Sequence, residues 1–227
     1  MMAAESIAPR RTDRAVFIGQ TGCGKTTLAR VLLATRPFVA VYDAKGLLRW
    51  NTFTRYTKLE KLMKAKESRL IYAPVAEELR DENFIEGFFR WVYKRRNTTL
   101  YVDEVYGVTK RDEIPPSYHA CLTRGRELGI STFSATQRPM LIPQVVLSES
   151  EHYYIFRLLL PQDRKKMREV IGLTERAISR LGKHEFFYGN NEGVVRGPLK
   201  LNLSPHGEGE SKTREKRANS PGAMAGA

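Results

Sequence analysis

The chain has 227 residues, 41% of them hydrophobic, which suffices for one packed α/β domain and is too few for two. No apolar run approaches the ~18–20 residues that span a bilayer, and residues 1–12 lack the apolar core of a secretory signal, so we expect a protein that is not secreted. The formal net charge of +13 favours a polyanionic partner, with an ordinary basic surface as the alternative. The two cysteines, Cys23 and Cys121, predict neither a zinc site nor a disulfide framework.

Short apolar runs alternate with helical stretches along the chain. We expect strands at 15–18, 38–42, 70–72, 99–102, 130–135 and 152–158, helices at 26–35, 83–95, 118–128 and 161–171, and a closing hairpin at 185–188 with 193–196. This alternation predicts an α/β fold with a mainly parallel β-sheet flanked by helices.

The domain boundaries follow from composition. We expect one folded domain at 13–203, preceded by a flexible arm at 1–12. The segment 204–227 has almost no large apolar residues and predicts a disordered, basic and polar tail.

A glycine-rich segment between the first expected strand and the first expected helix matches the P-loop pattern G-x-x-x-x-G-K-[ST]. Its backbone N–H groups and the following helix N-terminus favour phosphate, which predicts bound ATP. Lys25 would contact the β- and γ-phosphates, and the Thr26 hydroxyl would ligate Mg²⁺. The predicted nucleotide contacts are Gly19, Gln20, Thr21, Gly22, Cys23, Gly24, Lys25, Thr26 and Thr27.

Polar residues follow two further apolar strands. Asp103 and Glu104 come directly after 99–102, and Gln137 comes shortly after 130–135. Because ligand groups gather at the carboxyl ends of parallel strands, Asp103 is expected to hold Mg²⁺ and Glu104 to activate the attacking water. Gln137 either contacts the γ-phosphate or only caps the turn before Pro139.

These residues together resemble the FtsK–HerA superfamily of DNA-translocating ATPases, over roughly 13–201. The resemblance rests on the P-loop, the strand that ends in Asp103-Glu104, and the run from Arg126-Glu127-Leu128-Gly129-Ile130 into Ala135-Thr136-Gln137-Arg138-Pro139. Lys45-Gly46 resembles the family's turn after the second strand, and 181–187 resembles its last strand, although His184 stands where the family more often has glycine.

The resemblance implies a RecA-like core, a ring that is usually a hexamer, and an arginine finger. Arg126 would be the finger that acts on the γ-phosphate of the neighbouring subunit, with Arg124 as the alternative and a solvated surface as the plain interpretation of either.

Within the superfamily, a motor domain with short tails resembles the genome-packaging ATPases of tailless double-stranded DNA viruses that have an internal membrane. This implies double-stranded DNA as partner, a capsid or membrane protein at the virion vertex as docking partner, and a location in the host cytoplasm or at that vertex. The alternatives are a plasmid or chromosomal DNA translocase, a P-loop kinase of a small molecule, and a non-hydrolysing DNA-binding assembly protein.

Two basic segments are candidates for DNA contact. Lys110 and Arg111 lie in the polar stretch 106–116, which follows the acidic pair and predicts a loop that grips phosphates; the neighbouring carboxylates Asp112 and Glu113 favour an ordinary loop instead. The rival surface is Lys94-Arg95-Arg96, whose cations also suit a helix end.

Overall fold

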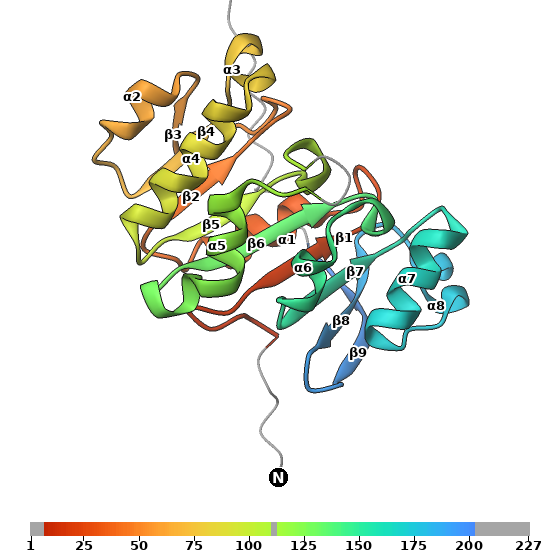
Figure 1. Ribbon diagram of the computed structural model, residues 1–227. Coiled ribbons are helices and arrows are strands. Elements are labelled where there is room, and N and C mark those ends of the chain that lie inside the picture. The colour runs from red at the N-terminus through yellow and green to blue at the C-terminus, as the bar shows by residue number, and fades with distance from the viewer. Residues whose placement is uncertain (1–6, 110–112, 203–227) are drawn as a thin grey trace, which may run out of the picture.

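The computed structural model describes residues 7–109 and 113–202, which form a nine-stranded sheet between layers of helices (Figure 1). The strand order is β3-β4-β2-β5-β6-β1-β7-β8-β9, and every pair from β3 to β7 is parallel. Strands β8 and β9 are added antiparallel at one edge. The predicted α/β fold with a mainly parallel sheet is therefore confirmed.

The strand bounds agree closely with the apolar runs in the sequence. Four of the central strands have every residue buried, which is why continuous apolar runs reveal them. The strands are β1 (Ala15–Ile18), β2 (Val39–Tyr42), β3 (Thr54–Tyr56), β4 (Arg69–Tyr72), β5 (Thr99–Val102), β6 (Ser131–Thr136), β7 (His152–Phe156), β8 (Glu185–Asn190) and β9 (Val195–Lys200).

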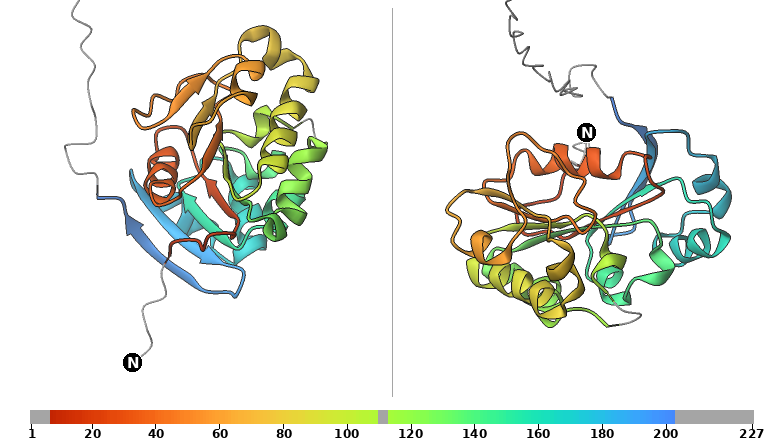
Figure 2. Two further views of the ribbon diagram at one scale, coloured as in Figure 1. Left: turned by 90° about the vertical axis from the view of Figure 1, so that its left-hand side faces the viewer. Right: turned by 90° about the horizontal axis from the view of Figure 1, so that it is seen from above.

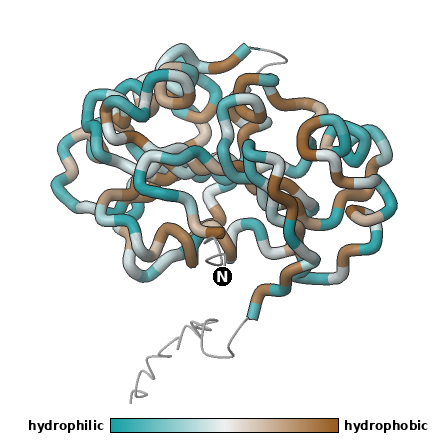
Figure 3. The backbone as a smooth tube through the Cα atoms, turned by 90° about the horizontal axis from the view of Figure 1, so that it is seen from below, coloured by the Kyte–Doolittle hydropathy of each residue, from teal (hydrophilic) through white to brown (hydrophobic). Residues whose placement is uncertain are grey.

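Side chains alternate along each strand, so the sheet has a hydrophobic core on each face. In β1, Val16 and Ile18 belong to one core, and Ala15 and Phe17 belong to the other. Helix α1 packs on the Phe17 face, and helices α2 and α4–α8 cover the opposite face (Figure 2). The hydrophobic segments of the chain accordingly concentrate in the interior of the molecule (Figure 3).

The longer helices match the predicted ones, and several short helices had no clear signal. Helix α4 carries an Asp81 cap, whose carboxylate accepts a hydrogen bond from the backbone N–H of Asn83 at 2.9 Å. The helices are α1 (Lys25–Leu33), α2 (Leu59–Met63), α3 (Ala76–Arg80), α4 (Glu82–Arg95), α5 (Pro116–Arg124), α6 (Gln144–Ser148), α7 (Pro161–Ile171) and α8 (Glu175–Arg180), with 3₁₀ turns η1 (Val105–Gly107), η2 (Gly125–Leu128) and η3 (Pro139–Leu141).

Two local predictions need correction. The helix expected at 118–128 ends at Arg124 and continues as the 3₁₀ turn η2. Gly125 at this junction packs closely on Ile130, where an added Cβ would lie 3.1 Å from that side chain. The stretch 106–116 is not all surface loop, since Val108 is 7% exposed and belongs to the hydrophobic core.

The expected arm boundary at residue 12 also differs from the contacts in the structure. The buried Arg36 guanidinium donates to the carbonyl oxygens of Pro9 and Arg10 at 2.6 and 2.8 Å, and Tyr154 donates to the carbonyl oxygen of Ile7. Residues 7–12 are therefore attached to the domain through backbone carbonyls, a contact that composition does not reveal. The remainder of the arm and the tail at 204–227 lie outside the described residues.

Candidate nucleotide-binding site

The glycine-rich loop lies at the carboxyl edge of the sheet, between β1 and α1. The backbone N–H of Gly19 donates to the carbonyl oxygen of Thr136 at 3.1 Å, and that of Gln20 donates to Arg157 at 3.2 Å. The loop is thus attached to the ends of β6 and β7, the two strands that flank β1.

Glycine is required at both ends of this loop. Gly19 has φ +156°, and a Cβ there would lie 2.5 Å from the Cβ of Phe156. Gly24 has φ +113°, and a Cβ there would meet Leu201 at 2.9 Å and the Nδ1 atom of His184 at 3.1 Å. The close packing leaves no room for a side chain, and the backbone conformation favours glycine.

Lys25 is buried at the first position of α1, with its side chain turned back onto the loop. Its ammonium donates to the carbonyl oxygens of Gly19 and Gln20 at 2.6 and 2.8 Å. Burial lowers the pKa of Lys25 below its usual value, and the carboxylates of Glu104 and Asp103 partly counteract this. A partly desolvated ammonium of this kind is well suited to bind phosphate oxygens.

The residues proposed for Mg²⁺ lie together. The hydroxyl of Thr26 donates to Asp103 Oδ1 at 3.0 Å, and the hydroxyl of Tyr101 donates to the same oxygen at 2.7 Å. Burial, followed by the nearby Asp103 carboxylate, raises the pKa of Tyr101 well above its usual value, so Tyr101 stays a neutral donor. Among residues 7–109 and 113–202, no cluster of three or more histidine, cysteine or carboxylate side chains could hold a metal alone. An oxygen pair completed by phosphates and water fits Mg²⁺.

Glu104 and Gln137 form a hydrogen-bonded pair next to the loop. Gln137 Nε2 donates to Glu104 Oε2 at 3.0 Å, and the Gln137 backbone N–H lies 3.4 Å from Glu104 Oε1. The carbonyl oxygen of the Gln137 side chain accepts a hydrogen bond from Thr21 at 2.8 Å. Gln137 therefore connects the glycine-rich loop to the carboxylate, an arrangement that a residue capping only its own turn would not have.

A cavity of about 270 Å³ joins these groups. Lys45, which follows β2, extends into it and lies 3.6 Å from Glu104 Oε2. Its lining comprises Thr21, Gly22, Gly24, Lys25, Thr26, Thr27, Lys45, Leu47, Leu48, Asp103, Glu104, Gln137 and His184.

The candidate finger residues lie at the opposite edge of the sheet. Arg126 precedes β6, whose six residues separate it by ~17 Å from Gln137 at the other end of the strand. It is half-exposed and forms an ion pair with Glu151, which precedes β7. Arg124 is exposed at the end of α5, near the same edge. Neither side chain is therefore positioned to reach the glycine-rich loop of its own chain.

The candidate DNA contacts have different outcomes. Lys110 and Arg111 lie outside the described residues, so their role stays a prediction. The rival cluster lies at the end of α4, just before β5 begins and hence at the edge opposite the cavity. There Arg95 lies over the Trp91 ring and donates to the carbonyl oxygen of Glu67, which gives it a structural role.

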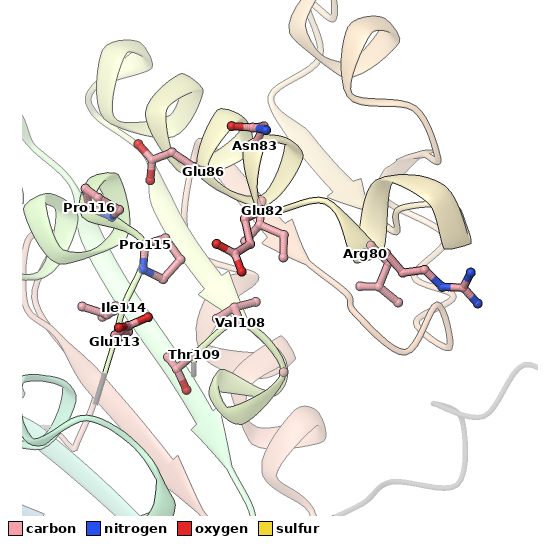
Figure 4. Close-up of a pocket in the computed structure, with 13 residues that line it drawn as sticks. Arg80, Glu82, Asn83, Glu86, Val108, Thr109, Glu113, Ile114, Pro115 and Pro116 are labelled. Carbon is pink, nitrogen blue, oxygen red and sulfur yellow. The ribbon is translucent and has the colours of Figure 1, made fainter. Parts of the chain in front are cut away.

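A larger cavity of about 570 Å³ lies between α3, α4 and the start of α5 (Figure 4). The described residues that line it include the carboxylates Glu82, Glu86 and Glu113, and Arg80, whose guanidinium points away from them in Figure 4. Glu86 accepts hydrogen bonds from the backbone and side chain of Ser117. An acidic lining does not suit phosphate, so the smaller cavity is the candidate nucleotide site.

Sequence reasoning assigned no role to three residues of the site. Tyr101 lies within an apolar run and showed no sign of its hydrogen bond to Asp103. Lys45 could have been found from the Lys-Gly turn after β2. His184 differed from the glycine that the superfamily more often has at this position, but this difference did not indicate that His184 lines the cavity.

A glycine-rich loop between a buried parallel strand and a helix, with lysine, threonine and two carboxylates at the same sheet edge, defines a P-loop NTPase site. No protein-family model matches the chain.

Two comparisons identify similar proteins. The chain is 26% identical over 209 residues to the DNA packaging ATPase P9 of Enterobacteria phage PRD1, covering 84% of this chain and 89% of P9. The structure is similar to the genome packaging NTPase B204 of Sulfolobus turreted icosahedral virus 2 bound to AMPPCP, with a TM-score of 0.72, 18% identity, and coverage of 86% of this chain and 100% of B204. The predicted resemblance is confirmed by the phage relative, and the predicted fold by B204.

A third similarity extends the fold beyond viruses. The cytoplasmic domain of the type VII secretion ATPase EccC from Thermomonospora curvata has a TM-score of 0.62 at 15% identity, over 90% of this chain and 28% of EccC. At this identity the likeness concerns the fold alone.

Replacing the buried lysine tests the site directly. We expect Lys25→Ala to weaken ATP binding by about 10- to 100-fold, because hydrogen bonds to charged groups contribute roughly 1.5–3 kcal/mol. Isothermal titration calorimetry measures the affinity, and the exposed Arg30→Ala on α1 is the matched control. Equal ATP affinity of Lys25→Ala and wild-type protein would contradict this phosphate site.

Proposed function

We propose that this chain is an ATPase that drives double-stranded DNA into a viral capsid. The observation that carries the proposal is the hydrogen-bonded group Thr21–Gln137–Glu104 beside the buried Lys25. Such a group suits hydrolysis, because a carboxylate that can orient water lies next to a phosphate-binding loop. The phage packaging ATPase P9 supports the assignment to DNA packaging.

Each site residue has a separate role in the proposed reaction. Lys25 and the loop N–H groups bind the β- and γ-phosphates, and Thr26 with Asp103 holds Mg²⁺, which supplies charge neutralisation when bound. Glu104 accepts the proton of the attacking water. Gln137 orients that water and, through Thr21, responds to the γ-phosphate. Glu104 must exchange its contacts with Gln137 and Lys45 for water before it can act.

A neighbouring subunit completes the proposed site in a ring, which we expect to be a hexamer. Arg126 is the proposed finger, and its release from Glu151 costs little because Glu151 keeps another cation. Arg14 donates to Glu151 through its backbone N–H, Nε and Nη2 atoms at 2.6, 3.2 and 2.6 Å. Arg124 stays the alternative finger.

The proposed partners are double-stranded DNA and a capsid or membrane protein at the virion vertex, reached from the host cytoplasm. The net charge of +13 supports a polyanionic substrate. No helix among the described residues is long and apolar enough to cross a membrane. A plasmid or chromosomal translocase would use the same chemistry and differ only in what it moves.

The carboxylate substitution separates binding from hydrolysis. We expect Glu104→Gln to bind ATP with near wild-type affinity and to lose turnover by at least ~100-fold, because shape is kept while the proton acceptor is lost. Phosphate release with and without duplex DNA measures turnover. Wild-type turnover in this variant would refute the assigned role of Glu104. If duplex DNA does not change the turnover of the wild-type protein, a small-molecule kinase or an assembly protein would be favoured.

Mixing two inactive variants tests the finger. We expect Arg126→Ala to lower kcat by roughly 10³-fold or more with little change in ATP affinity. Mixed with Glu104→Gln subunits, it should regain activity at interfaces that pair an intact glutamate with an intact arginine. Arg124→Ala in the same mixing experiment tests the alternative finger, and full activity of strictly monomeric wild-type protein would exclude a finger in trans.

The DNA contacts require a double substitution. We expect Lys110→Ala with Arg111→Ala to keep basal ATPase activity, to lose DNA stimulation, and to reduce the slope of log affinity against log salt by roughly two. The control is Lys94→Ala with Arg96→Ala at the other edge of the sheet. If DNA still stimulates the ATPase activity of the first variant but not that of the control variant, the DNA contacts would be assigned to the end of α4 instead.

A further inference from the structure

We propose that His184 is a nucleotide-binding residue, whose imidazole hydrogen-bonds the sugar-bearing end of the bound nucleotide at its ribose oxygens. The inference rests on the proposed ATP-binding function and adds a contact outside the P-loop. His184 immediately precedes β8 and lines the same cavity as Lys25, Thr26 and Glu104.

The imidazole is directed at the glycine-rich loop. A Cβ added to Gly24 would lie 3.1 Å from His184 Nδ1, so this nitrogen approaches the residue that precedes α1. Nδ1 is buried and has no hydrogen-bond partner within the part of the chain that the structure describes. Buried polar atoms are nearly always paired, so this covered nitrogen is an unusual cost in the nucleotide-free protein. A turn of the ring toward the cavity that His184 lines would let a ligand pair it.

The backbone at His184 is strained, and the surrounding loop holds it in place. His184 has φ +63°, in the left-handed region that non-glycine residues rarely adopt. Its carbonyl oxygen accepts a hydrogen bond from Leu201 at 3.0 Å, and Glu185 closes the preceding turn by accepting from Gly182 at 2.8 Å. An imidazole in a position that suits glycine carries a conformational cost, which a functional contact would explain.

Strand order decides which end of the nucleotide His184 meets. Glu104 follows β5 and Gln137 follows β6, which lie on one side of β1 and its P-loop, and Lys45 after β2 lies on that side as well. His184 precedes β8, on the other side of β1. Because the γ-phosphate must face Glu104 and Gln137, the phosphate chain extends from them across the loop, and its sugar-bearing end points toward β8.

Glycine substitution separates a ligand contact from a structural role. We expect His184→Gly to weaken binding of both ATP and ADP by about 10-fold, the loss of one hydrogen bond to a polar or charged ligand group. Inorganic tripolyphosphate, which lacks the sugar and base, should bind unchanged. The melting temperature should stay equal or rise, because glycine accepts the left-handed backbone. His184→Asn, which tolerates this backbone and keeps a polar side chain, should restore part of the affinity.

Asn97→Gly is the matched control. Asn97 also has positive φ, at +42°, and lies just before β5 at the edge of the sheet away from the cavity. We expect this variant to leave ATP, ADP and tripolyphosphate binding unchanged. Calorimetric titration of each ligand gives the affinities, and thermal unfolding of the nucleotide-free proteins gives the stabilities.

The outcomes distinguish failure of this inference from failure of the proposed function. Unchanged ATP affinity in His184→Gly would overturn the inference alone. Equal loss of ATP and tripolyphosphate affinity would overturn the contact with the sugar-bearing end, and loss of affinity accompanied by a lower melting temperature would assign His184 a structural role instead. Wild-type protein that binds neither ATP nor tripolyphosphate would overturn the proposed function and this inference together.

Discussion

The parallel pairing of β5, β6 and β1 is the constraint on which the rest of the site depends. Parallel strands end at the same edge, so Asp103, Gln137 and the glycine-rich loop meet although more than a hundred residues separate the first loop residue from Gln137. Thr21 donates a hydrogen bond to Gln137, and Gln137 donates one to Glu104, so this proximity becomes a connected polar group. A slip in register of either pair would separate these partners.

This constraint explains how much the sequence could predict. Fully buried strands give continuous apolar runs, and the residues directly after such strands could be assigned to the site from the sequence alone. The short strand β3 has two exposed residues and no such pattern, and the packing of Gly125 on Ile130 at the α5–η2 junction is a tertiary contact. His184 lines the cavity because the turn before β8 carries it there, and a tertiary contact of this kind leaves no local signal in the sequence.

The same topology divides the proposed chemistry between two edges of the molecule. The P-loop and Glu104 lie at the carboxyl edge, whereas Arg14, Arg126 and their shared partner Glu151 lie at the amino edge. Within the cavity, Lys25 binds loop carbonyls and Lys45 faces Glu104; outside it, Arg138 is paired with the buried Asp163. In the proposed ring, a guanidinium for the γ-phosphate would come from a second subunit whose amino edge approaches this carboxyl edge.

Departures from ordinary folding rules concentrate at this carboxyl edge. Lys25 is a buried cation with a lowered pKa, and Gly24 and His184 meet with their backbones in the left-handed region. The nitrogen of His184 is buried beside them without a partner from the described residues. The buried ammonium of Lys25 and the unpaired nitrogen of His184 each cost stability in the nucleotide-free protein, and an anionic, hydrogen-bonding ligand would relieve both costs. The site is thus less stable alone than with nucleotide bound, so binding there stabilises the loop and the start of β8 together. The C-terminal hairpin is joined to this same corner, because Leu201 packs on Gly24 and donates its backbone N–H to the carbonyl oxygen of His184.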